Sequence, residues 1–499
     1  MKFNTKKYRT GFLLLILIVT VSGCKKYLDE KDKGNFVKSN YFTSGSQAQT
    51  FVNGIYTSLY LFQNGDAYGE SPFITIELFA GHATSLGQSV NNNNVIHQRT
   101  DAVNPGFEDV WQNSYQAIAN ANLALEKIPA ISMDDTQKKR LIGEIYFLRA
   151  FFYYHLVRLY GDVPLITTSI TVNSPDLYPS RIAVAKVYDQ IISDLKAAEA
   201  SPLPATDQTG RASQGAVSTL LASVYLTTAG FPMQITANYA NAATEAQKVI
   251  SSTYALFLNY AFLHDNAHKN QGELIFQAQY LVGISTNAIP QLTIPFNLGV
   301  GAYGDHLGAM IPTNEFFNSY ETGDLRTKER QFYFSSYPQY GDTTKNIVFG
   351  EHALYKYFHL ESALGNGQSD ENWTFFRLPE AMLIFAEATN EVSGPNADAY
   401  AQINLIRQRA KLVPLSGLNK DSFRIAIWKE RYHELAYEDK AYFDVQRTHQ
   451  TYDPIHNTFG DATSTPTEQG VTFKPQYYLW PIPQREISTN SKLTQNPGW

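Results

Sequence analysis

The sequence predicts a mainly α protein, a tetratricopeptide-like helical-repeat scaffold with long irregular loops. Apolar residues recur at helical spacing along most of the chain, and short turns between helical stretches favour antiparallel neighbours. A few long stretches rich in Gly, Asn, Tyr and Pro interrupt this pattern, and loops of that length are usually functional. No clean period of about 34 residues is present, so we expect a degenerate array.

The start of the chain predicts a lipoprotein signal rather than part of the fold. Basic residues precede an apolar run from Phe12 to Val19, which is too short to span a bilayer, and small residues then lead to Cys24, the only cysteine. We interpret residues 1–23 as a signal peptide and 24–45 as a lipidated polar tether. An ordinary signal peptide with an incidental cysteine is the alternative.

The helices are expected in the following order. Apolar spacings of three and four predict one helix containing Trp111 to Leu125, closed by Pro129, and another containing Leu141 to Leu159, closed by Gly161. The next has a buried stripe from Val184 to Ala198. Further helical stretches are expected at 47–62, 213–229, 238–251, 377–392, 396–411 and 420–439. Sustained helical pattern is missing from 63–106, 255–375 and 450–476. We divide the folded part into an N-terminal helical region, 46–254, and a C-terminal region with binding loops, 255–499.

Composition and net charge exclude some classes of function. A net charge of −6 argues against a general nucleic-acid binder, which needs a basic surface. The 32 tyrosines exceed what a core needs, because each buried hydroxyl requires a partner, so we expect many of them at surfaces or in loops. The 11 histidines show no metal-ligand spacing, so neither a metal nor another cofactor is expected.

Three carboxylates raise the question of catalysis. Glu430, Glu434 and Glu438 are four residues apart, which would place them on one helix face at a spacing that superficially suits glycoside hydrolysis. Several arginines lie nearby in the sequence, so we interpret the glutamates as part of a structural ion-pair network. No nucleophile elbow, phosphate loop or paired-histidine zinc motif is present. We therefore expect a protein that is not an enzyme.

Two loop regions combine aromatic and polar residues as sugar binding requires, because sugar C–H faces pack on aromatic planes while hydroxyl groups need polar partners. Trp373 is the leading candidate, since it alone among the five tryptophans lies in a polar stretch outside the predicted helices and the C-terminal segment. The other candidates are Tyr68, His82 and Arg99 from the first region and Tyr303, His306, Tyr337 and Tyr340 from the second.

Six segments resemble the SusD/RagB-like family of surface lipoproteins, in the family's order. One of them ends in the turn Gly161-Asp162-Val163-Pro164, and another contains the glutamates discussed above. The segments are 144–164, 211–226, 377–390, 404–410, 430–447 and the tail formed by 479–483 and 495–499. The resemblance extends from Cys24 to the C-terminal residue.

This resemblance implies a non-enzymatic binding subunit, anchored by lipid on the outer face of a Gram-negative outer membrane. It would capture oligosaccharide or polysaccharide for a partner TonB-dependent transporter of the SusC type, over which it acts as a lid. No nucleic acid would take part. Family members often have a tryptophan in the loop before the Trp111 helix, and residues 60–106 contain none. A peptide-binding subunit of a similar uptake complex is therefore one alternative, and a surface glycoside hydrolase is the other.

Overall fold

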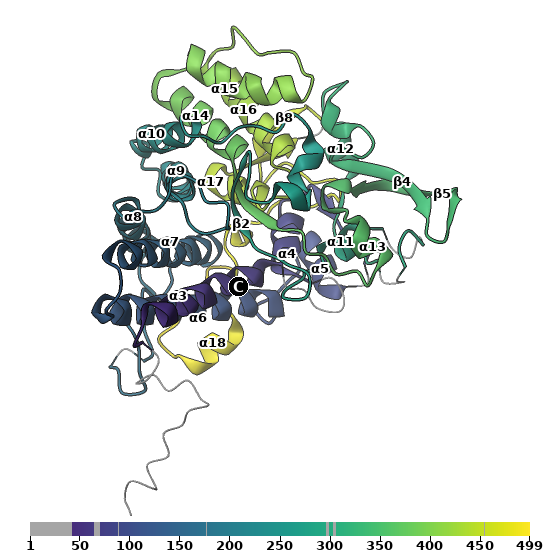
Figure 1. Cartoon of the computed structure of the whole chain (residues 1–499). Helices are drawn as coiled ribbons and strands as arrows, with labels where there is room; N and C mark the ends of the chain where they lie inside the picture. Colours follow the sequence, from purple (N-terminus) through teal and green to yellow (C-terminus); the bar gives the residue numbers. More distant parts are fainter. Residues whose placement is uncertain are drawn as a thin grey trace, which may run out of the picture.

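A computed structural model describes residues 42–499 except for 64–69, 88, 176, 296–298, 303–305 and 454. Cys24, the signal peptide, Tyr68 and Tyr303 lie outside the described residues. Stacked helices form a frame on one side of the molecule, and most of the loops and short strands gather on the other side (Figure 1).

The frame consists of helices that pack side by side, mostly in chain order. The contacting pairs are α6 with α7, α7 with α8, α8 with α9, α9 with α10, α10 with α14, and α14 with α15 and α16. Their bounds are α3 (Gly45–Tyr56), α6 (Pro105–Lys127), α7 (Asp135–Tyr160), α8 (Val184–Glu199), α9 (Gln214–Ala229), α10 (Asn238–Ile250), α14 (Leu378–Ser393), α15 (Ala397–Arg409) and α16 (Lys420–Glu434). The predicted mainly α, helical-repeat scaffold is confirmed.

Local sequence explains where these helices begin and end. The carboxylate of Asp134 accepts a hydrogen bond from the Gln137 N–H at 2.8 Å, which caps the start of α7. Gly161 ends this helix with φ of +71°, a left-handed conformation that favours glycine. The same helix is buried along most of its length, which explains its dense aromatic sequence.

The prediction of a non-helical 63–106 was wrong in part. This stretch contains α4 (Pro72–Phe79) and α5 (Val90–Ile96). Every residue of α4 is buried, so its apolar run has no polar face and therefore no helical periodicity to detect. The short helices elsewhere are α11 (Ile289–Thr293), α12 (Asn314–Asn318), α13 (Leu360–Leu364), α17 (Ala441–Thr448) and α18 (Gln484–Thr489).

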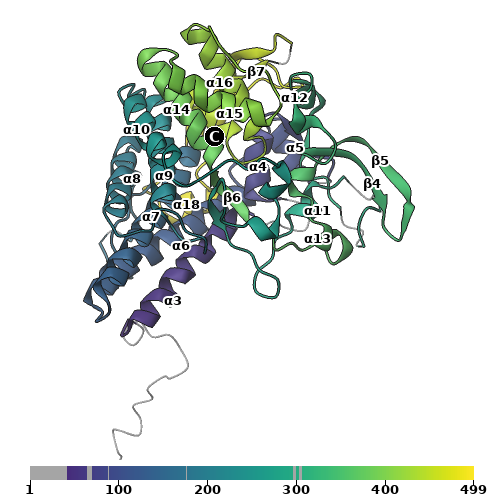
Figure 2. The same ribbon diagram turned by 45° about the horizontal axis from the view of Figure 1, so that its top comes forward.

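The described strands form separate antiparallel pairs rather than one sheet. The pairs are β1 (Ala83–Thr84) with β3 (Ile311–Pro312), β2 (Leu274–Ala278) with β6 (Trp373–Arg377), β4 (Tyr333–Gln339) with β5 (Asp342–Leu354), and β7 (Gln450–Asp453) with β8 (Thr458–Asp461). The β4–β5 hairpin extends away from the body in both views (Figures 1 and 2).

Helix α16 is shorter than predicted. It ends at Glu434, and Tyr437 and Asp439 just beyond it have φ of +62° and +57°, which no α-helix can accommodate. Glu438 therefore lies in a turn, and the predicted helix face with three carboxylates is wrong for this residue.

The main core joins the two halves of the sequence. Trp480 is fully buried against Phe107 with ring centroids 4.7 Å apart, and its backbone N–H donates to the Leu159 carbonyl at 2.6 Å. The C-terminal segment is thus part of the packing of α6 and α7. None of the helices in the described part of the chain has the length and apolar character needed to cross a membrane.

Candidate functional site

The structure brings the two predicted binding-loop regions into contact. Ala83 and Thr84 pair with Pro312 and Ile311 in the β1–β3 ladder, and the Leu86 N–H donates to the Gly308 carbonyl at 2.8 Å. Segments about 220 residues apart in the sequence are therefore held side by side by backbone hydrogen bonds.

The β4–β5 hairpin carries the exposed aromatic group of this region. Its two-residue turn is Tyr340-Gly341, with Gly341 at φ of +78°, so the local sequence places Tyr340 at the tip. The Tyr340 side chain is 48% exposed, and its backbone N–H donates to the Gly299 carbonyl at 3.0 Å.

Tyr337, three residues before Tyr340 on the same hairpin, belongs to a further group of partly exposed aromatic rings. Tyr337 packs on Phe358 with centroids 4.5 Å apart, and Tyr355 stacks on the same Phe358 at 5.5 Å. The guanidinium carbon of Arg330 lies 5.1 Å from the centre of the Tyr337 ring. We call Arg330, Tyr337, Tyr340 and Tyr355 the hairpin surface.

A small core of its own supports the hairpin surface. It includes Phe334, Phe349 and Phe358 and is separate from the main core of the frame. Burial raises the pKa of the Tyr337 hydroxyl, so this group stays neutral at physiological pH. The arrangement offers flat apolar ring faces together with one cation, which suits a ligand with C–H faces and hydroxyl groups.

Trp373, the leading candidate from the sequence, does not lie in an exposed loop. It begins strand β6 and is 3% exposed. Its ring stacks on Tyr357 with centroids 5.4 Å apart and contacts Phe73 at 4.8 Å. The expectation of a loop position was therefore wrong, and both ring faces meet protein rather than solvent.

The histidine candidates are also buried. His82 is 1% exposed, lies among the rings of Phe316 and Tyr437, and has its Nε2 atom 2.9 Å from the Glu77 carboxylate. His306 is equally buried. Both rings are enclosed by protein in this structure, and their role in ligand binding stays a prediction. Arg99 is exposed after the end of α5, as a surface contact requires.

The expected ion-pair network around the glutamates is confirmed. Glu434 is fully buried and accepts hydrogen bonds from Arg377 and Arg409, each at 2.6 Å, and from Arg326 at 3.1 Å. Glu430 pairs with the same Arg326 at 2.7 Å. These carboxylates are oriented by arginines inside the core and do not face a cleft.

About half of the tyrosines that the structure describes are buried, and nearly all of the others are half-buried, which is fewer at the surface than expected. Tyr153, for example, is fully buried and donates to the Ile166 carbonyl at 2.9 Å. Among the described residues, the two most exposed aromatic side chains are Tyr178 at 49% and Tyr340 at 48%. Only Tyr340 was a sequence candidate.

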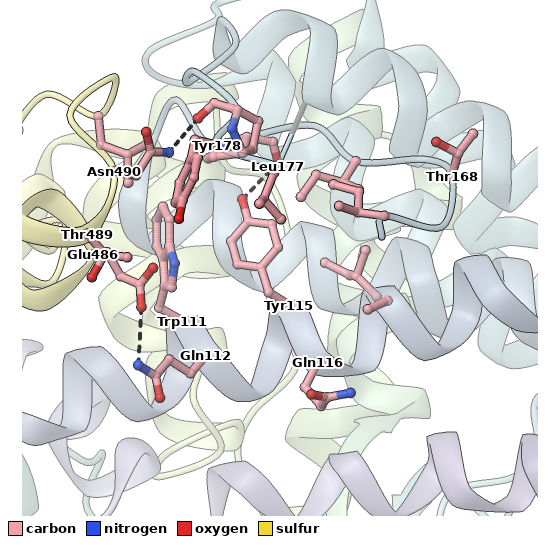
Figure 3. A pocket seen from close by; sticks show the side chains of 17 residues that line it. Trp111, Gln112, Tyr115, Gln116, Thr168, Leu177, Tyr178, Glu486, Thr489 and Asn490 are labelled. Carbon is pink, nitrogen blue, oxygen red and sulfur yellow. Dashed lines mark hydrogen bonds between the residues drawn. The ribbon is translucent and has the colours of Figure 1, made fainter. Parts of the chain in front are cut away.

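Tyr178 marks an open groove that the sequence did not indicate. The groove has a volume of about 440 Å³ and lies between α6, the chain after α7, and α18 (Figure 3). Trp111 and Tyr115 project from α6 into it, opposite Tyr178. Trp111 packs in the core at 3% exposure, as its helical spacing predicted, while Tyr115 is half-buried; periodicity does not reveal where a helix face is left partly uncovered.

No cluster of His, Cys, Asp and Glu suited to holding a metal ion is found among the residues that the structure describes.

A helical-repeat frame that carries aromatic side chains on projecting loops is typical of a binding protein. Two family models match the chain: "SusD family" over residues 312–499 and "Starch-binding associating with outer membrane" over 26–226. The chain belongs to the SusD family.

Individual relatives agree with this assignment. A SusD superfamily protein from Parabacteroides distasonis is 35% identical, with a TM-score of 0.88 over 91% of this chain and 99% of that one. SusD-like protein P2 from Formosa agariphila is 29% identical over 99% of this chain and 100% of its own length. Surface glycan-binding protein A from Bacteroides thetaiotaomicron, in complex with laminarihexaose, shares the fold with 20% identity and a TM-score of 0.72 over 91% of this chain and 100% of that one.

Proposed function

We propose that this protein captures a polysaccharide or oligosaccharide at the surface of the outer membrane, with the hairpin surface as its ligand site, and delivers it to a partner TonB-dependent transporter. The observation that carries the proposal is the exposed ring of Tyr340 at the tip of the hairpin that also carries Tyr337, with Arg330 over the Tyr337 ring. Membership of the SusD family supports the glycan ligand, and the laminarihexaose bound to the Bacteroides relative suggests a first ligand to test.

The proposed protein is a binder and not a hydrolase. Glycoside hydrolysis needs two carboxyl groups on either side of an accessible glycosidic bond. Glu430 and Glu434 are buried and paired with Arg326, so a sugar chain has no access to them.

Native gels cast with laminarin, starch, xyloglucan, galactomannan and α-mannan test the ligand site. The chain from residue 25 onward is used, which leaves out the proposed signal peptide and Cys24. We expect at least one polysaccharide to retard the protein and Tyr340→Ala to weaken that binding by about tenfold, the effect of removing an exposed aromatic anchor.

Leu258→Ala is the matched control, because Leu258 is exposed but lies outside the hairpin surface. If polysaccharide retards Tyr340→Ala as strongly as the original protein, the hairpin surface is not the ligand site. Binding of peptides but no polysaccharide would favour the peptide-uptake alternative, and clearing of the polymer would contradict a non-enzymatic role.

The membrane anchor is proposed from Cys24 and its preceding sequence. A lipidated Cys24 would hold the protein at the membrane by burying acyl chains. We expect Cys24→Ala to move the protein from the membrane fraction to the soluble fraction, with the transporter copurifying only with the anchored form. A Cys24→Ala variant that stays in the membrane fraction would contradict the anchor.

A further inference from the structure

We propose that the groove of Figure 3 is a second glycan site, for one or two neutral sugar residues that rest on the rings of Tyr178 and Tyr115. This inference rests on the proposed function, but it concerns different residues. Figure 1 places α18, which borders the groove, well away from the β4–β5 hairpin. The two most exposed aromatic rings among the described residues thus mark two separate surfaces.

The lining of the groove has the composition of a small-molecule site. Its volume of about 440 Å³ falls within the range of about 300–1,000 Å³ usual for such sites. Apolar side chains such as Ile166 and Leu177 line one part of it. Polar side chains surround them: Gln112, Gln116, Thr168, Tyr178, Glu486, Thr489 and Asn490. The Tyr178 hydroxyl makes no hydrogen bond within the described residues, so it is available to a ligand.

The wall of the groove is rigid before any ligand arrives. The Tyr115 hydroxyl donates to the Pro164 carbonyl at 2.8 Å, and Asn122 donates to the carbonyls of Ile166 and Thr168 at 2.9 and 3.3 Å. Arg149, itself held by Asp194 at 2.7 Å, donates to the Thr167 carbonyl at 3.1 Å. A ligand therefore need not order this wall, which lowers the entropic cost of binding.

These same bonds argue against an extended peptide as the ligand. A peptide that binds by adding a strand needs free backbone groups on its receptor. The carbonyls of Pro164, Ile166, Thr167 and Thr168 are already occupied by side chains from α6 and α7. Recognition in the groove must come from side-chain amides, hydroxyls and rings, which match the hydroxyl groups and C–H faces of a sugar.

Charge favours a neutral sugar over an acidic one. No lysine or arginine lines the groove in the part of the chain that the structure describes, and the charged side chain there is Glu486. Glu486 accepts a hydrogen bond from Gln112 at 3.1 Å and would repel a uronate or a sulfate group.

The test separates the two sites with one variant each. A hairpin-disabled protein, Tyr337→Ala with Tyr340→Ala, is titrated by calorimetry with the hexasaccharides laminarihexaose, cellohexaose, maltohexaose and mannohexaose. We expect at least one to bind the hairpin-disabled protein, and the further change Tyr178→Ala to weaken that binding tenfold or more. Tyr178→Phe keeps the ring and should retain most of the affinity. Leu258→Ala, exposed but outside the groove, is again the control.

Each outcome bears on one proposal or the other. If none of the four sugars binds the hairpin-disabled protein, or if Tyr178→Ala changes nothing, the groove is not a glycan site and the inference is overturned. If Tyr178→Ala abolishes binding in the otherwise unaltered protein while the hairpin variants bind normally, the groove is the glycan site. The proposal that the hairpin surface binds glycan is then contradicted. On a polymer, loss of either site should weaken retardation, because two sites on one chain bind with avidity.

Discussion

Trp373 fills the space between two other aromatic rings, so its main effect should be on stability. Tyr357 covers one side of the indole at 5.4 Å and Phe73 contacts it at 4.8 Å. We expect Trp373→Ala to lower the free energy of unfolding by about 3–5 kcal/mol, through lost burial and the cavity left behind. Urea unfolding followed by circular dichroism measures this. Tyr340→Ala, at an exposed position, should stay within about 0.5 kcal/mol of the original protein.

Equal stability of the Trp373→Ala and Tyr340→Ala proteins would contradict this packing role.

The burial of single side chains was the property that the sequence predicted least well. The polar residues before Trp373 suggested a loop, yet Trp373 begins a strand whose burial depends on the distant Phe73 and Tyr357. Tyr340, chosen as a candidate from the aromatic and polar composition of its region, is exposed because it lies in a two-residue turn with Gly341.

At the scale of one element, α16 depends on buried charge. Burial opposes ionisation of Glu434, but Arg409, Arg377 and Arg326 outweigh it and lower the pKa of this carboxyl from 4.5 to about 2. The ion pairs therefore stabilise the fold fully above about pH 5, and this contribution is lost as the pH falls from 4.5 toward 2.

Glu434→Gln removes this contribution. We expect it to destabilise the protein by about 3–5 kcal/mol at pH 7, because it removes a buried counter-charge that Arg326, Arg377 and Arg409 share. The difference from the original protein should shrink as the pH falls from 5 toward 2, which urea titrations at a series of pH values would measure. Asp421→Asn is the control, since Asp421 is exposed and pairs with Arg424 at the surface. A difference that does not vary with pH would show that the charge of Glu434 is not what stabilises α16.

Elements with one apolar face were predictable, and those buried on all sides were not. The spacing from Trp111 to Leu125 located α6, which has a solvent face. The same reasoning failed for α4, whose every residue is buried. It also extended α16 too far, because the four-residue spacing of Glu430, Glu434 and Glu438 looks helical although Glu438 lies in a turn. The groove could not be predicted either, since it depends on which part of α6 the chain after α7 leaves uncovered.

At the scale of the whole molecule, the C-terminal segment completes the helical frame. Trp480→Ala should lower the free energy of unfolding by about 3–5 kcal/mol, because its ring packs on Phe107 from the other half of the sequence. Hydrogen exchange should then accelerate in α6 and α7 as well as around the substituted residue. Lys492→Ala, at an exposed position of the same segment, should leave exchange in α6 and α7 unchanged. Faster exchange confined to residues near Trp480 would contradict this coupling.

Because Trp480 lies near the C-terminus, its core contacts form late in the synthesis of the chain. A ribosome makes α6 and α7 more than 300 residues before Trp480, and until then Phe107 and the Leu159 carbonyl lack the partners they have in the finished fold. The core around α6 and α7 therefore lacks the Trp480 contacts until the C-terminal segment has been made. With the signal peptide proposed for residues 1–23, a chain whose core closes this late would still be open when it meets an export channel, which an already folded protein could not enter.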